Sequence, residues 1–117
     1  MAKARFYWKS TCSTCRDARS FILNELGAAV VERNYAKEPL TIDELKEIFK
    51  NADPRDYINP KSPAYKAMGL KGKTLTPDQA FELMAKEPNL LKRPLTIVGK
   101  TFIAGFDRDA LRKALTA

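Results

Sequence analysis

The chain has 117 residues, 44% of them apolar, which is enough to bury the core of one globular domain and too little for two. Twenty-one Lys and Arg against fourteen Asp and Glu give a net charge of +7, which favours anionic partners, although basic side chains that only solvate exposed faces explain it equally well. No apolar run is long enough to span a membrane, and the basic N-terminus lacks a secretory signal, so we expect a cytoplasmic protein without a membrane partner. No zinc-finger or RNP1-type motif indicates direct binding of nucleic acid.

Both cysteines of the chain, Cys12 and Cys15, form a C-x-x-C motif between an expected strand and an expected helix. Residues 4–8 are mostly aromatic and contain no turn residue, which predicts a strand. Apolar residues at helical spacing from 18 to 26 predict a helix that ends at Gly27. Cys12 is therefore expected at a helix N-terminus, where unpaired backbone N–H groups and the helix dipole stabilise a thiolate.

Two cations near the motif, Lys9 and Arg16, should also favour the thiolate of Cys12. Cys12 is predicted to be the nucleophile, and Cys15, one helical turn later, can resolve its adduct as an internal disulfide. A structural zinc ion needs about four Cys or His ligands, and the chain has no further cysteine and no histidine, so no metal site is expected. The remaining alternative is a pair of unreactive core cysteines, but a C-x-x-C between a strand and a helix is the signature of a thioredoxin-like redox site.

The middle of the chain, residues 37–90, is predicted to be an enlarged helical insert. It contains two capping-box signatures, at residues 41–44 and 76–79, and apolar residues at helical spacing follow each of them. Between these helices, residues 51–73 are interrupted by prolines, and only residues 64–68 have a helical pattern.

The two ends of the chain supply the strands. Residues 28–35, apolar and β-branched at their centre, predict a second strand that completes a βαβ unit. Residues 95–98 and 101–104 predict a hairpin with Gly99-Lys100 as its turn, and a last helix follows. The order βαβ, helical insert, ββα is that of an α/β thioredoxin-like fold. We therefore expect a single domain, residues 1–117, whose core is formed by residues 1–36 and 91–117.

Three segments have the pattern of a known family: Tyr7 to Arg16 with the C-x-x-C, Leu90 to Leu95 with Arg93-Pro94, and Gly105-Phe106 before the last helix. In this order and spacing the chain resembles the arsenate reductase-like (ArsC/Spx) family of thioredoxin-fold proteins over nearly its whole length. In its short length the chain most resembles the YffB-like branch of this family. The resemblance implies that Pro94 follows a cis peptide bond, which would aim the backbone of Arg93 at Cys12. Arg93, helped by Arg16 and Lys9, would then bind the anionic group of a substrate or donor.

The chain also departs from the arsenate reductases of this family. The family resemblance implies that those enzymes have three arginines around the cysteine. They also have a serine where this chain has Cys15. The middle arginine aligns with Asn59, and Lys100 and Arg108 are only approximate matches for the third. One certain arginine would hold an oxyanion poorly, so arsenate is not the expected natural substrate.

The resemblance implies a small thiol–disulfide oxidoreductase, specifically a glutathione-dependent thiol reductase that works as a monomer without a bound cofactor. Glutathione or a glutaredoxin would be its electron donor and partner. One alternative is an Spx-like redox-controlled regulator that binds the C-terminal domain of the RNA polymerase α subunit. The other is a glutaredoxin-dependent arsenate reductase.

Overall fold

The computed structural model describes residues 4–50 and 52–116. The chain forms two compact units, the first from Met1–Glu38 with Arg93–Ala117 and the second from Pro39–Lys92. The segments that carry the C-x-x-C motif and Arg93 therefore belong to one unit, although most of the sequence lies between them.

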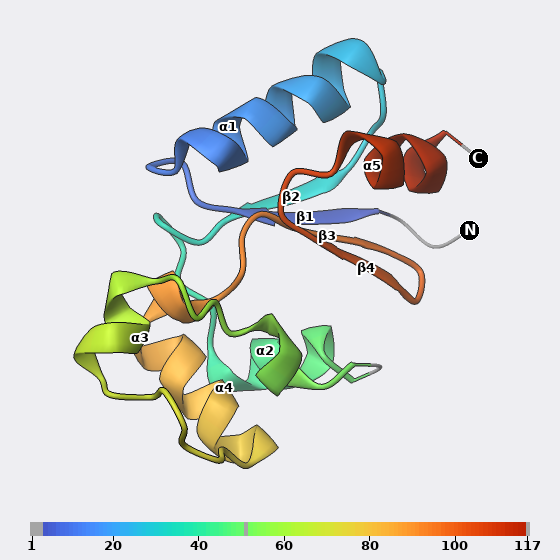
Figure 1. The fold of residues 1–117 in the computed structure, drawn as a ribbon. Helices are drawn as coiled ribbons and strands as arrows, with labels where there is room; N and C mark the ends of the chain where they lie inside the picture. Colours follow the sequence, from blue (N-terminus) through green and yellow to red (C-terminus); the bar gives the residue numbers. More distant parts are fainter. Residues whose placement is uncertain (1–3, 51, 117) are drawn as a thin grey trace. The chain divides into compact units, whose positions relative to one another are not determined.

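A mixed sheet is the centre of the first unit, and within the described residues it has four strands in the order β2-β1-β3-β4 (Figure 1). β1 (Arg5–Trp8) pairs in parallel with β2 (Val31–Asn34) and antiparallel with β3 (Leu95–Val98). β3 continues through a tight turn into β4 (Thr101–Ala104). With α1 (Ser13–Ser20) between β1 and β2 and α5 (Arg108–Leu115) after β4, the arrangement confirms the predicted α/β class with a βαβ and a ββα part.

The core of the first unit lies on the face of the sheet that α1 and α5 cover (Figure 1). Phe6 of β1 and Leu111 of α5 are both 0% exposed, and they pack with the other members of one cluster, Ala18, Phe21, Ile22 and Ile103. Full burial of each large apolar side chain contributes about 1.5–3 kcal/mol. This packing fixes the helix that begins at the cysteines against the strand that precedes them.

The helix that follows the cysteines was predicted as one continuous α-helix, but its end is π-helical. α1 ends at Ser20 and continues as a π-helical segment, η1 (Phe21–Glu25), where the Leu26 backbone N–H donates to the Phe21 carbonyl at 3.0 Å. Two consecutive side chains of this segment, Phe21 and Ile22, are both buried in the core. Gly27 ends the helix as predicted, with a φ of 61° that favours glycine.

The second strand is shorter than predicted. The prediction covered residues 28–35, whereas β2 contains only Val31–Asn34. The ladder is limited by its partner, because β1 begins at Arg5, which lies opposite Val31. The hairpin prediction is confirmed, since Gly99 adopts a φ of 62° in the turn between β3 and β4.

The second unit is helical. It contains α2 (Ile42–Ile48), η2 (Pro54–Tyr57), α3 (Pro63–Ala67), α4 (Pro77–Lys86) and η3 (Pro88–Leu90). Both predicted capping boxes are present: the hydroxyls of Thr41 and Thr76 accept from the backbone N–H groups of Glu44 and Gln79, whose side chains accept in return. The 3-10 turn η2 was not predicted, and it lies in the segment that the prolines marked as irregular.

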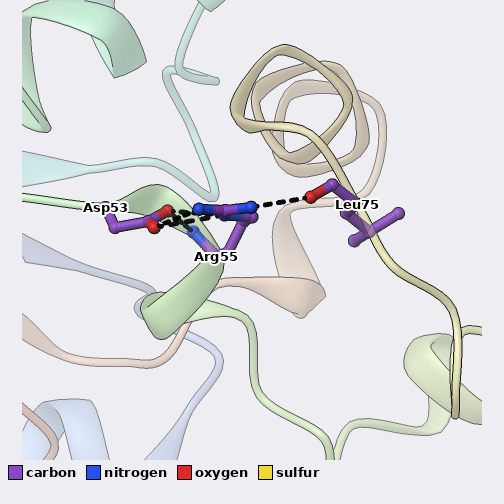
Figure 2. Close-up of polar contacts among 3 residues, drawn as sticks. All are labelled: Asp53, Arg55 and Leu75. Atoms are coloured by element: carbon purple, nitrogen blue, oxygen red, sulfur yellow. Dashed lines mark hydrogen bonds and ion pairs between the residues drawn. The ribbon is translucent and has the colours of Figure 1, made fainter.

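Arg55 fixes the start of η2 within the second unit (Figure 2). Its Nε and Nη2 donate to the Asp53 carboxylate at 3.0 and 2.7 Å, and its Nη1 donates to the Leu75 carbonyl at 3.1 Å. Hydrogen bonds from Arg55 hold the pKa of Asp53 below its usual value. The three contacts connect η2 to the segment that precedes α4. Among the helices of residues 4–50 and 52–116, none is long and apolar enough to cross a membrane.

Candidate active site

Cys12 is the N-cap residue of α1. Its backbone is extended, with φ −103° and ψ 121°, and a turn positions it: the Cys12 N–H donates to the Lys9 carbonyl at 2.9 Å. Its carbonyl accepts the first helical hydrogen bond from the Arg16 N–H at 3.1 Å. The Cys12 side chain is half-buried, so the sulfur is held at the open end of the helix and solvent can still reach it.

The pKa of Cys12 is lowered from its ordinary value. Partial burial opposes this change, but the backbone N–H and thiol of Cys15, followed by the guanidinium of Arg93, stabilise the thiolate more strongly. A thiolate is the nucleophilic form of cysteine, so these neighbours favour the reactive form of Cys12.

Cys15 lies in the opposite environment. Its side chain is 0% exposed, and burial together with the nearby Cys12 sulfur raises its pKa to about 12. Arg93 and the backbone N–H of Lys9 offset only part of this effect. Both residues are free thiols in the structure. The pair therefore consists of one accessible sulfur that ionises easily and one buried sulfur that retains its proton.

The Arg93–Pro94 peptide bond is cis, the isomer that the family resemblance implied. Pro94 is fully buried, and its carbonyl accepts from the Gly105 N–H at 2.8 Å. Since Leu95 lies opposite Tyr7 in the sheet, the start of β3 adjoins the end of β1 from which the chain runs to Cys12. This register brings the Arg93 guanidinium to the Cys12 sulfur.

The other two predicted cations stabilise the Cys12 thiolate less than expected. Lys9 and Arg16 are not among the main groups that lower the pKa of Cys12. Arg16 is exposed, and its Nη1 donates to the Ser10 carbonyl at 3.2 Å across the same loop. Lys9 acts on the pair through its backbone, whose N–H faces Cys15 and whose carbonyl accepts from Cys12. Closeness in sequence indicated the right loop, but it did not identify the cation that matters electrostatically.

The two approximate matches for a third anion-binding residue are not at this site. Lys100 lies in the β3–β4 turn, at the end of β3 opposite to Pro94. The Arg108 guanidinium lies over the Phe106 ring, 4.6 Å from its centroid, and also contacts the Phe21 ring. Both positions are therefore wrong for an oxyanion bound beside Cys12. Asn59 belongs to the second unit, where its side chain accepts from the Lys61 N–H at 3.0 Å.

Sequence reasoning missed Tyr35, which directly follows β2. Its side chain is 1% exposed, and the charges of Cys15, Arg93 and Cys12 all act on its hydroxyl. The sequence indicated only that this residue ends an apolar segment.

Within residues 4–50 and 52–116 no cluster of three or more Cys, His, Asp or Glu side chains is arranged to hold a metal ion.

Comparison with known proteins places this geometry in context. The model of the ArsC family matches residues 7–114. The global transcriptional regulator Spx of Listeria innocua is 34% identical over 111 residues, which cover 93% of this chain and 84% of that protein.

Solved structures share the fold over nearly the full length. The protein SACOL0876 from Staphylococcus aureus COL is 30% identical with a TM-score of 0.80, and the match covers 97% of this chain and 99% of the other. The YFFB (PA3664) protein is 24% identical with a TM-score of 0.80 and coverages of 97% and 99%. The arsenate reductase from Vibrio cholerae is 23% identical with a TM-score of 0.79 and coverages of 97% and 98%. The last two similarities show a common fold.

Proposed function

Because the chain belongs to the ArsC family, we propose that it is a cytoplasmic thiol–disulfide oxidoreductase that uses Cys12 and Cys15, with glutathione or a glutaredoxin as electron donor. The observation that supports this most directly is the contrast between the two sulfurs. The pKa of the accessible Cys12 is lowered, chiefly by Cys15 and Arg93 acting against partial burial, whereas burial raises that of Cys15 to about 12. A reactive outer thiolate with a protonated inner thiol is the arrangement that a nucleophile and a resolving cysteine require.

In the proposed cycle the Cys12 thiolate attacks one sulfur of an oxidised substrate. The substrate S–S bond breaks, a mixed disulfide forms on Cys12, and the other substrate sulfur leaves as a thiol. Cys15 then attacks the Cys12 sulfur, which releases the second substrate thiol and forms the Cys12–Cys15 disulfide. Glutathione reduces that disulfide to two thiols and is itself oxidised to glutathione disulfide.

Arg93 would act on the anionic group of the substrate or donor. Its guanidinium already lies close enough to lower the pKa of the Cys12 thiolate, and it remains charged throughout the cycle. A glutathionyl group carries carboxylates, which a guanidinium can bind through paired hydrogen bonds. Arg16 and Lys9 on the neighbouring loop add positive charge along the approach to the sulfur.

Replacing each cysteine tests the cycle. With glutathione and a small disulfide substrate, Cys12→Ser should abolish turnover, because the nucleophile is lost. Cys15→Ser should accumulate a mixed disulfide on Cys12, detectable as an added glutathionyl mass. Thr11→Ala, at an exposed residue beside Cys12, serves as the matched control and should retain activity. Full turnover by the Cys12→Ser protein would remove the proposal.

The identity of 34% to Spx supports a second candidate, a redox-controlled regulator without turnover. In this alternative, oxidation to the Cys12–Cys15 disulfide would change the affinity of the chain for the C-terminal domain of the RNA polymerase α subunit. A pull-down with that domain, using reduced and oxidised protein in parallel, measures this directly. Redox-dependent capture together with no turnover of disulfide substrates would favour the regulator over the enzyme.

The fold shared with an arsenate reductase supports a third candidate less strongly, because among the described residues Arg93 is the one cation named among the main groups that lower the pKa of Cys12. Arsenate-dependent consumption of reduced glutathione in the presence of a glutaredoxin would test it. Saturable turnover would show that the neutral Asn59 does not prevent oxyanion binding.

A further inference from the structure

Tyr35 is a buried polar residue that the proposed cycle does not use. Its backbone N–H donates to the Trp8 carbonyl at 3.0 Å, so it lies beside the end of β1, where the chain enters the loop to Cys12. Its side chain is 1% exposed, and within residues 4–50 and 52–116 its hydroxyl has no hydrogen bond of ordinary geometry, although the Arg93 guanidinium lies close enough to interact with it. Phenylalanine would fill the same space without burying an unpaired hydroxyl, so packing alone does not explain a tyrosine here.

The hydroxyl lies within electrostatic range of the redox pair. Burial raises the pKa of Tyr35, the Cys15 and Cys12 sulfurs raise it further, and the Arg93 guanidinium opposes them. The phenol therefore keeps its proton at neutral pH and can act only as a donor toward a sulfur that becomes negative. The groups that act on it are the two sulfurs, whose charge changes during the cycle, and one guanidinium, whose charge does not.

Cys15 needs such a donor at one step. It is 0% exposed and holds its proton in the resting state, yet its sulfur must become negative when it attacks. In the resting state the Cys15 thiol hydrogen-bonds to the Cys12 sulfur and stabilises its thiolate form. Once Cys12 carries a substrate, that thiolate no longer exists, and the charge that develops on Cys15 requires a different partner.

We propose that Tyr35 is a positioning residue for the resolving step, in which its hydroxyl donates a hydrogen bond to the Cys15 sulfur as that sulfur attacks the mixed disulfide on Cys12. The inference rests on the proposed function and adds one residue to its second step. In that step the Cys12–substrate S–S bond breaks and the Cys12–Cys15 bond forms. The departing substrate sulfur takes the electron pair and leaves as a thiolate, the proton that Cys15 loses passes to water, and Tyr35 keeps its own proton.

The test uses the reduced full-length protein and a limiting amount of 5,5′-dithiobis(2-nitrobenzoate), a chromogenic disulfide. Attack by Cys12 releases one coloured thiolate, and resolution by Cys15 releases the second, so stopped-flow absorbance separates the two steps. Tyr35→Phe should slow the second phase about tenfold or more, the rate equivalent of one hydrogen bond to a charged group. The first phase should change less than about twofold, because the groups that stabilise Cys12 remain.

A pH profile separates this role from a purely structural one. The second phase should accelerate with pH as Cys15 ionises, and in Tyr35→Phe that rise should move to higher pH. Cys12 is then part of a disulfide and carries no charge, so the rise reports the ionisation of Cys15 itself. Placing 3-fluorotyrosine, a stronger donor, at position 35 should speed the second phase without changing the shape of the side chain much.

Tyr7→Phe is the matched control, since it removes the same oxygen from a tyrosine whose hydroxyl accepts from Arg5 Nη1, and it should leave both phases unchanged. Equal second phases in Tyr35→Phe and the unmodified protein would overturn this inference and leave the proposed function intact. Equal slowing of both phases would also overturn it, by showing a general disturbance. If the unmodified protein released no second thiolate, the resolving step itself would be absent and the proposed function would fail as well.

Discussion

Removing one oxygen atom from Tyr35 should stabilise the protein, the opposite of what most substitutions at a fully buried residue do. The Tyr35 ring is buried, and within the described part of the chain its hydroxyl has no hydrogen bond of ordinary geometry. In the unfolded chain that hydroxyl is hydrogen-bonded to water, and folding replaces those bonds only with the nearby Arg93 guanidinium. Tyr35→Phe keeps the ring and its packing and removes only the unpaired group.

The expected gain follows from the balance of two effects. Burying an unpaired hydroxyl costs about 1–3 kcal/mol. The nearby charge of Arg93 recovers part of this cost, and removal of the oxygen leaves a small void with fewer dispersion contacts. We therefore expect the lower end of the range, a free energy of unfolding about 1 kcal/mol higher, or about 3–6 °C in Tm for a chain of this size.

Urea unfolding of the reduced protein at pH 7, followed by circular dichroism, measures this change. Tyr7→Phe is the control, and its free energy of unfolding should change in the opposite direction, because the Tyr7 hydroxyl accepts from Arg5 Nη1 at 3.3 Å. Losing that bond should lower the free energy of unfolding by about 0.5 kcal/mol. A loss of 1 kcal/mol or more in Tyr35→Phe would refute the reasoning, because it would mean that the hydroxyl has a partner in the folded protein.

Other substitutions test the core, the second unit and the candidate site. Leu111→Ala should lower the free energy of unfolding by about 2–5 kcal/mol, measured by thermal unfolding, because Leu111 is 0% exposed within the core cluster. Thr76→Ala should cost about 0.5–2 kcal/mol in the same assay by removing the Thr76–Gln79 capping box, whereas a change within error would show that the box is not formed in solution. Arg93→Gln should raise the pH at which iodoacetamide labels Cys12, because the thiolate loses its cation; an unchanged midpoint would contradict the placement of Arg93. In the unmodified protein at pH 8 a single thiol should react, since the other has a pKa of about 12, and Cys12→Ser should then leave the protein unlabelled.

Local signals in the sequence predicted most of the elements. The capping boxes at residues 41–44 and 76–79 and the glycine turn at residues 99–100 depend on neighbours a few residues away, and all three are present. The π-helical end of the first helix was not predictable, because helical and π spacing differ little over a single turn. The length of β2 depends on where its partner β1 begins, which is a tertiary constraint.

The candidate site was predictable in part. The C-x-x-C and its position at a helix start follow from the residues themselves, whereas Arg93 entered only through the family resemblance. Nothing within the sequence around Cys12 indicates that a guanidinium far along the chain reaches the sulfur while the adjacent Lys9 and Arg16 contribute less. Tyr35 was missed because an unpaired buried hydroxyl is a property of packing and has no sequence pattern.

The register of the sheet has a consequence for how the chain folds during synthesis. Arg5 of β1 lies opposite Ile97 of β3, so about 90 further residues must leave the ribosome after β1 before this strand gains its second neighbour. Until then one edge of β1 lacks its β3 partner, and an exposed strand edge can pair with other nascent chains. The Cys12 thiolate therefore gains the guanidinium of Arg93 only after the segment that leads into β3 has been made and β3 has paired with β1.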